Sequence, residues 1–282
     1  MPHGRLPPIG VSQIETIAKY PWRLPANPTQ ALTGRFAIDG TQLMLIDLAR
    51  NARDRIRNGH RSMVFHRAMR RLSQNPREAM IDSGSLLSDL VYGWGNESWS
   101  GEPEFLRACV EHALNAKAPM LECGSGLTTM ILGVLAQHTR NTLWTLEHLP
   151  EWGYRVQCYL DEFAITSVRV CVAPLANYGE CDWYDPPFES MPERFGLVVC
   201  DGPPSSAKGG RYGLAPVMAG RMQPNCVILL DDAERKDEQD IIVRWSEELP
   251  CRFSRMGTTK PFFVAVVDGR VDSSRPMQAI RT

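Results

Sequence analysis

The residues best suited to chemistry begin with the segment Leu121–Thr129, which reads Leu-Glu-Cys-Gly-Ser-Gly-Leu-Thr-Thr. Gly124 and Gly126 have no Cβ atom, so the backbone there can take positive φ angles and approach a ligand closely. The segment lies between a short apolar run and a pattern of helical period. A strand, a glycine turn and a helix in this order form a nucleoside-binding crevice in an open α/β sheet.

The kind of nucleoside follows from a glycine that is missing. The dinucleotide fingerprint has a third glycine three residues after the second one, and that position here is Thr129. Glu122 directly precedes the turn, where a carboxylate suits an amino group better than a pyrophosphate. We therefore expect S-adenosylmethionine and not NAD, with contacts from Glu122, Gly124, Ser125, Gly126 and Thr128.

Carboxylates close four of the five central strands that we predict, at residues 119–122, 142–147, 168–172, 195–201 and 226–231. They are Glu122, Glu147, Asp201 and the pair Asp231-Asp232. Parallel strands present their carboxyl ends at one edge of a sheet, and ligands bind at that edge. Because Glu147 follows the glycines by about 20 residues, we expect it to accept hydrogen bonds from both ribose hydroxyls.

Together these motifs resemble the class I S-adenosylmethionine-dependent methyltransferases over residues 104–268. The resemblance implies that the two glycines pack against the cofactor and that Glu122 lies near its aminopropyl end. It also implies that Glu147 holds the ribose, that Leu175 flanks adenine, and that Asp201 faces the methyl-transfer site. His148 follows Glu147 and is expected to line the adenine side or the surface, not to act as a base. Such an enzyme mainly aligns the nucleophile, the methyl group and the sulfur, because the sulfonium carbon is already electrophilic.

The acids after the fourth and fifth strands also resemble those of metal-dependent, catechol-type O-methyltransferases. That family has an Asp after the fourth strand and an Asp-Asn pair after the fifth, and this chain has Asp232 in place of the Asn. The resemblance implies Mg²⁺ bound by Asp201, Asp231 and Asp232, where the ion would lower the pKa of a substrate hydroxyl. The alternative is that Asp231 and Glu234 form a capping-box pattern for the next helix.

A glycine-rich segment, 201–213, follows the strand that should face the transferred methyl group. Within it, Arg211 could clamp an acceptor carboxylate or phosphate, and Lys208 or Tyr212 could take the acceptor proton. These three residues and Asp201 are our candidate catalytic residues. The segment resembles the Asp-Gly-Pro…Gly-Arg loop of plant glucuronoxylan methyltransferases, which implies a sugar hydroxyl as acceptor. The alternative is a flexible loop in which Arg211 pairs locally.

The elements needed to position these residues alternate between strand and helix from residue 104 onward. This alternation predicts an α/β fold with a seven-stranded, mostly parallel Rossmann-like sheet, helices on both faces and a helical N-terminal extension. The last two strands, 252–256 and 262–267, have no helix between them, so one should run antiparallel. We expect three regions: a Pro-rich irregular arm (1–40), a helical, Arg-rich extension and loop (41–103), and the cofactor-binding domain (104–282).

The extension is expected to contain two helices separated at Gly59, followed by a loop at 82–103 that lies over the pocket. No apolar run reaches the roughly 18–20 residues that span a bilayer, and no apolar segment typical of a signal peptide follows the N-terminus. The eight cysteines occur singly, without the C-x-x-C spacing of zinc or redox sites. These features favour a cytoplasmic protein without a membrane span.

Charge leaves a second class of function open. Residues 50–77 contain nine Arg and one Asp, an excess of +8 in a chain whose net charge is −1. Such a segment can bind phosphate, so a nucleic-acid methyltransferase or binder is an alternative to a solvated helix face. A nucleoside-binding protein without catalysis is a third hypothesis, and a homodimer formed through residues 1–100 is a further one. The main hypothesis is an O-methyltransferase for a small-molecule or glycan hydroxyl.

Overall fold

A computed structural model describes residues 40–81, 84–96 and 100–269, with side-chain positions from residue 53 onward. The Pro-rich arm predicted for 1–40 lies, except for its last residue, outside these ranges. The chain divides into two compact units, 1–63 and 64–282, which we describe separately. Of the first unit, the structure describes the N-terminal part of one helix, α2 (Gly40–Gln74), whose last residues belong to the second unit.

The second unit is built on a seven-stranded sheet in the order β3-β2-β1-β6-β7-β9-β8. Six strands run in one direction, and β9 runs antiparallel to its neighbours β7 and β8. The strands are β1 (Met120–Cys123), β2 (Leu143–Glu147), β3 (Val168–Val172), β6 (Phe195–Cys200), β7 (Met222–Leu230), β8 (Cys251–Met256) and β9 (Phe262–Val267). The predicted fold class is confirmed, including the antiparallel strand in the terminal pair.

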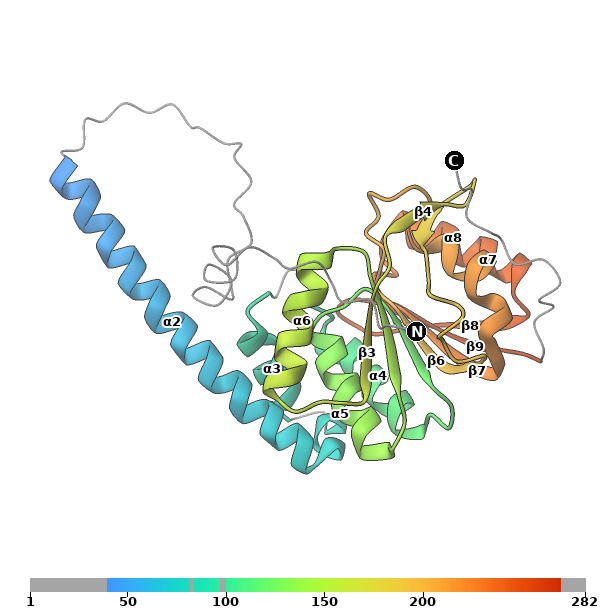
Figure 1. Ribbon diagram of the computed structural model, residues 1–282, viewed down its shortest axis with the longest axis horizontal. Coiled ribbons are helices and arrows are strands. Elements are labelled where there is room, and N and C mark those ends of the chain that lie inside the picture. The colour runs from blue at the N-terminus through green and yellow to red at the C-terminus, as the bar shows by residue number, and fades with distance from the viewer. Residues whose placement is uncertain (1–39, 82–83, 97–99, 270–282) are drawn as a thin grey trace. The chain divides into compact units, whose positions relative to one another are not determined.

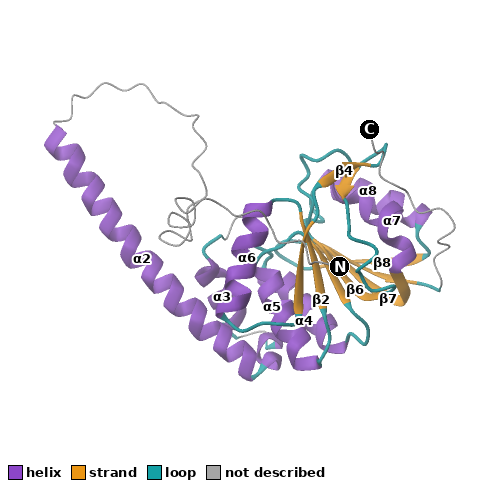
Figure 2. Ribbon diagram, in the orientation of Figure 1, coloured by secondary structure: helices purple, strands orange, loops and turns teal. Residues whose placement is uncertain are grey.

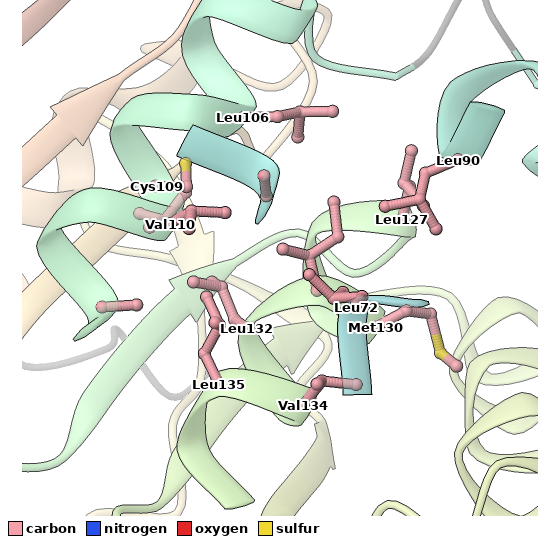
Figure 3. Close-up of a cluster of buried hydrophobic side chains, with 14 of the residues drawn as sticks. Leu72, Leu90, Leu106, Cys109, Val110, Leu127, Met130, Leu132, Val134 and Leu135 are labelled. Atoms are coloured by element: carbon pink, nitrogen blue, oxygen red, sulfur yellow. The ribbon is translucent and has the colours of Figure 1, made fainter. Parts of the chain in front are cut away.

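Helices cover both faces of this sheet (Figures 1 and 2). One apolar core includes side chains from the end of α2 and from α3 (Leu86–Trp94), α4 (Pro103–Asn115), α5 (Leu127–Thr139) and α6 (Pro150–Glu162). Figure 3 shows part of it, where Leu106, Cys109 and Val110 of α4 lie near Leu132 and Leu135 of α5. The other core includes α7 (Leu214–Met218) and α8 (Lys236–Glu248).

These helices form because apolar residues recur at helical spacing and face the sheet. On α5 the packing is tight at Gly133, where a Cβ atom would lie 2.7 Å from a methyl group of Val168 on β3. Beyond the sheet, β4 (Leu175–Asn177) and β5 (Asp182–Tyr184) form a separate antiparallel hairpin. The sequence did not predict this hairpin, since its strands are only three residues long.

Two expectations for the extension are wrong. Gly59 does not separate two helices, because α2 is continuous across it, and one glycine costs only about 1 kcal/mol relative to alanine in a helix. The expected loop at 82–103 contains α3, whose Leu86, Leu90 and Trp94 are buried. Their spacing is that of an amphipathic helix, but the Gly- and Ser-rich composition around them favoured a loop.

Candidate active site

Backbone hydrogen bonds at the carboxyl edge of the sheet bring the predicted site residues side by side. The N–H of Gly124 donates to the end of β2 at 2.9 Å, and that of Asp201 to the end of β1 at 3.0 Å. Asp231 continues the row by donating to the end of β6 at 3.4 Å. Strand order changes direction between β1 and β6, which is where open α/β sheets bind ligands.

The glycine turn after β1 has one packed and one open glycine. Gly124 has a φ of +89°, and a Cβ atom there would lie 3.3 Å from the backbone nitrogen of Gly202. Gly126, the N-cap of α5, has no atom within 4 Å of where its Cβ would be. The turn therefore closes against β6 at its first glycine and leaves room for a ligand at its second.

Glu147, at the end of β2, points toward this turn. Its Oε2 accepts hydrogen bonds from the backbone N–H and the hydroxyl of Ser125, at 3.1 and 2.7 Å. Its Oε1 accepts one from the backbone N–H of Leu149 at 2.9 Å. A carboxylate has about four acceptor sites, so Glu147 keeps capacity for further donors such as ribose hydroxyls.

Glu122 is buried and is connected to the glycine turn through Thr129. It is 1% exposed, and its Oε2 accepts a hydrogen bond from the hydroxyl of Thr129 at 2.7 Å. The same hydroxyl accepts the backbone N–H of Gly126 at 2.8 Å. Burial raises the pKa of Glu122 to about 8. The carboxyl group is thus tied to the helix start through Thr129, and its predicted contact with an amino group stays a prediction.

The remaining predicted cofactor contacts surround this turn. Nδ1 of His148 lies 3.2 Å from Glu147 Oε1, which makes an ion pair when the imidazole is protonated. Thr128 is buried in the first turn of α5. Leu175 begins β4 and is half-buried beside the second apolar core. Their contacts with adenine or methionine stay predictions.

Two aromatic residues near the turn were missed from the sequence. The indole N–H of Trp152, on α6, donates to the carbonyl of Ser125 at 2.7 Å and fixes the middle of the turn. Tyr184, on β5, is fully buried, and its hydroxyl has no hydrogen-bond partner among the described residues. That hydroxyl lies so close to Gly202 that a Cβ atom there would collide with it. Only the unpredicted hairpin brings Tyr184 to this place.

These features fit the implied cofactor. The open space at Gly126 suits a ligand that lies against backbone, and Glu147 provides a carboxylate beside it. The unpartnered hydroxyl of Tyr184 is a buried polar group of the kind that a ligand atom can satisfy. The residues present can therefore hold S-adenosylmethionine.

A dense charged cluster lies at the ends of β6 and β7. Nη2 of Arg211 donates to Asp201 Oδ1 at 2.9 Å and to Asp232 Oδ2 at 2.8 Å. Its Nη1 donates to the carbonyl of Asp231 at 2.9 Å and lies 3.4 Å from Glu238 Oε1. The guanidinium is only 4% exposed. Arg211 therefore pairs with carboxylates of its own chain, including Asp232 and Glu238, which are distant in the sequence.

Lys260 completes this cluster and was missed from the sequence. Its Nζ lies 3.2 Å from Asp231 Oδ2 and 2.6 Å from Asp232 Oδ1. Lys260 comes from the β8–β9 connection, which the antiparallel β9 brings back to the carboxyl end of β7. Asp232 has a φ of +62°, a strained conformation, and its carboxylate contacts Arg235 at 2.8 Å in addition to Arg211 and Lys260.

The charges change how the acids titrate. Burial raises the pKa of Asp201 to about 7, although Arg211 opposes the rise. Burial also raises the pKa of Asp231, with Lys260 opposing. The pKa of Asp232 is lowered, because Arg211 and Lys260 outweigh its burial. Asp201 keeps 29% of its side chain exposed, so it is the carboxylate of this trio that a ligand can reach.

The implied Mg²⁺ can be tested against these contacts. Ligand atoms of Asp201, Asp231 and Asp232 lie within 4.8 Å of one another, and hard oxygen donors suit this ion. However, Arg211 or Lys260 already contacts each of the three carboxylates. A further cation would have to displace these groups, so the arrangement present does not fit a bound metal. We derive no chemical step through one.

Two candidate catalytic residues have partners elsewhere. The ammonium of Lys208 donates to the carbonyl of Gly179 at 2.7 Å. The hydroxyl of Tyr212 donates to Glu248 at 2.7 Å, and Arg244 stacks 3.4 Å from the centre of its ring. Neither contact joins the residue to Asp201, and their roles as proton acceptors stay predictions.

The capping alternative for Asp231 is wrong. The next helix, α8, begins at Lys236 with Arg235 as its N-cap, four residues beyond Asp231. The carboxylate of Asp231 instead contacts Lys260. The residues that would have formed the capping box, 231 and 234, both precede the helix.

Comparisons with known proteins concern the fold. No family model matches the chain, and no curated protein matches it. The solved O-methyltransferase TomG of Streptomyces achromogenes, in complex with SAM, is 14% identical over 72% of this chain and 90% of its own, with a TM-score of 0.43. The SAH-bound methyltransferase PaMTH1 of Podospora anserina is 11% identical over 84% of this chain and 100% of its own, with a TM-score of 0.43. A ribosomal protein L11 methylase of Lactobacillus delbrueckii is 11% identical over 58% and 77%, with a TM-score of 0.42.

Among the described residues, none of the helices combines the length and apolar character needed to cross a bilayer. All eight cysteines are free thiols.

Proposed function

We propose that this protein is an S-adenosylmethionine-dependent methyltransferase. The observation that carries the proposal is the pairing of Glu147 with the glycine turn on the neighbouring strand. Glu147 is 3% exposed and points to Ser125, beside the open space at Gly126. A buried carboxylate next to exposed backbone is suited to two adjacent ribose hydroxyls and the chain of atoms that continues from the sugar.

The acceptor side supports transfer to oxygen. Asp201 directly follows the strand next to the turn, and 29% of its side chain is exposed, so its carboxyl is accessible to a substrate hydroxyl. A small-molecule or glycan hydroxyl is the acceptor that we propose, on the resemblance of the 201–213 segment. Within this proposal the chain's residues bind and align the two substrates, and the cofactor supplies the electrophilic carbon.

Calorimetry with S-adenosylmethionine and S-adenosylhomocysteine tests the proposal on the wild type and on Gly126→Leu. Because no atom lies within 4 Å of the Cβ position of Gly126, a side chain can start there without a clash at its first atom, and leucine should occupy space that we propose for the ligand. We expect the wild type to bind both compounds and the variant to lose binding, with melting temperatures that agree closely.

Gly59→Leu is the matched control, since the Cβ position of Gly59 is also open but lies on α2. It should bind like the wild type. Absence of binding by the wild type, or equal binding by Gly126→Leu, would refute the proposal. Product detection by mass spectrometry with candidate hydroxyl acceptors then separates an enzyme from a protein that only binds the nucleoside.

A second candidate, nucleic-acid binding, is favoured by the Arg-rich part of α2. Arg53, Arg55 and Arg57 are exposed on one helix, where Arg57 pairs with Asp54 at 3.0 Å. Binding through phosphate contacts weakens steeply as salt increases. A gel-shift titration with duplex DNA and RNA should show retention that salt abolishes, and unshifted bands at low salt would exclude this candidate.

A further inference from the structure

The charged cluster at the ends of β6 and β7 is organised around Lys260. Four acids meet there, Asp201, Asp231, Asp232 and Glu238, and their side chains other than that of Asp201 are at most 4% exposed. Buried carboxylates at this spacing are costly unless cations compensate them. The question that the cluster raises is which cation does so.

Lys260 occupies the position that a cation shared by two of these carboxylates would occupy. Its Nζ contacts Asp231 Oδ2 and Asp232 Oδ1 at once, and 25% of its side chain is exposed. Arg211 bridges Asp232 to Asp201 on the other side. The trio that could hold a metal is therefore already linked from end to end by two organic cations.

The connection that carries Lys260 is fixed on both sides. Before it, Thr258 donates its N–H and hydroxyl to the two carboxylate oxygens of Glu104, each at 2.7 Å. After it, the carbonyl of Pro261 accepts the N–H of Ala233 at 2.8 Å. These bonds tie the β8–β9 connection to α4 and to the end of β7, so the backbone is held in place on both sides of Lys260.

A divalent ion beside Lys260 would be repelled by the ammonium at short range. Like charges at this distance repel one another more strongly in a partly buried site than in water. Entry of a metal therefore requires the ammonium of Lys260 to move away from Asp231 and Asp232.

We propose that Lys260 takes the place of a divalent cation in the Asp201–Asp231–Asp232 cluster, and that methyl transfer by this protein needs no metal. The inference deepens the proposed function, because it assigns the positive charge on the acceptor side to an ammonium group. An ammonium has three donors, and its contacts with Asp231 and Asp232 leave one. The acceptor class that suits such a group is a hydroxyl or an anionic oxygen.

Binding of Mn²⁺, followed by electron paramagnetic resonance and by melting temperature, tests the inference on the full chain. Wild-type protein that a chelator has freed of metal should not bind Mn²⁺ at millimolar concentration, and its melting temperature should not rise when the ion is added. Lys260→Ala should bind one Mn²⁺ per chain at least 10-fold more tightly and gain thermal stability from it. Lys236→Ala is the matched control, because Lys236 is 78% exposed on α8 and pairs with Asp240.

Removal of the ammonium can itself destabilise the fold, since it leaves buried acids uncompensated. Lys260→Gln therefore accompanies the alanine variant, because its amide can still donate to a carboxylate while carrying no charge. Stoichiometric binding of Mn²⁺ by the wild type, or no gain of binding in a folded Lys260 variant, would overturn the inference.

The two proposals fail in distinguishable ways. A wild type that binds no S-adenosylmethionine removes the proposed function, whatever Mn²⁺ does. A wild type that binds both the cofactor and Mn²⁺, with turnover abolished by a chelator, keeps the proposed function and removes the role of Lys260. Turnover unchanged by the chelator agrees with both proposals.

Discussion

The two halves of the candidate site hold their acids in opposite ways. On the cofactor side, Glu147 and Glu122 are bonded to neutral groups, namely backbone N–H groups and the hydroxyls of Ser125 and Thr129. On the acceptor side, the carboxylates of Asp201 and Asp232 are bonded to the guanidinium of Arg211. The first half keeps acceptor capacity for a ligand, whereas the second half is compensated before any ligand arrives.

Because their acids are held differently, the two halves should respond differently to substitution. Neutral donors hold a carboxylate in place without cancelling its charge, so Glu147 can still attract hydroxyl or amino groups. Cations beside buried acids make a rigid support, because any change leaves a charge uncompensated. We therefore expect variants of the acceptor side to lose stability first, and variants of the cofactor side to lose binding first.

The largest effect is expected for Arg211→Met. Loss of the guanidinium leaves Asp201, Asp232 and Glu238 near one another without it, which should cost about 3–5 kcal/mol of folding free energy. The melting temperature should fall by roughly 10 °C. Arg244→Met is the control, because the Arg244 side chain is 41% exposed and its ion pairs contribute at most about 1 kcal/mol. Equal melting temperatures for the two variants would contradict the view that Arg211 compensates the buried acids.

Glu122→Gln should change how stability depends on pH. The pKa of Glu122 is about 8 in the folded protein and near 4.5 when the chain unfolds, so the folded state holds the extra proton between these values. The free energy of unfolding should therefore decrease as the pH rises from about 4.5 to 8, because the unfolded state releases the Glu122 proton first. The glutamine variant has no titrating group at this position. Between pH 5 and pH 8, its free energy of unfolding, measured with urea, should therefore fall by about 2–4 kcal/mol less than that of the wild type. Parallel pH profiles would show that Glu122 is already ionised in the folded protein.

Glu147→Gln should weaken binding of S-adenosylhomocysteine by about 10- to 100-fold, because one charged acceptor of two hydroxyl groups is lost. Calorimetry measures this effect. The matched variant Glu151→Gln changes an exposed acid on the first turn of α6 and should bind like the wild type. If both variants bind equally well, Glu147 does not hold the ribose.

The smallest effect is expected for Trp152→Phe. The variant keeps an aromatic ring but loses the N–H that donates to the carbonyl of Ser125. One such hydrogen bond is worth about 1 kcal/mol, so binding should weaken about fivefold while the fold is kept. Titration calorimetry resolves this change. An unchanged affinity would mean that the turn does not need the indole to hold its shape.

The sequence was sufficient for the fold and for placing Glu147 beside the glycine turn, because both depend on local patterns. The glycine turn lies within one strand–helix unit, and Glu147 ends the next strand along the chain. The alternation of strands and helices then determines which edge of the sheet these residues share. The strand ends differ from those predicted by no more than one residue, except at the start of β7, which begins at Met222, four residues before the predicted start at residue 226.

The acceptor side could not be assembled in the same way. Arg211 was singled out, but only the packing of its segment shows that it bonds to the chain's own acids. Lys260 is 29 residues from Asp231, and nothing in the Thr-Thr-Lys-Pro sequence around it indicates a partner. The hairpin that carries Tyr184 is too short to give a periodic signal.

A crystal structure of the wild-type protein with S-adenosylhomocysteine tests the central claim most directly. We predict that the ribose hydroxyls bond to the Glu147 carboxylate, that the homocysteine portion runs along Gly124–Gly126, and that the sulfur faces Asp201. A ligand bound at another place, or ribose hydroxyls that leave Glu147 bonded only to Ser125 and Leu149, would contradict the account.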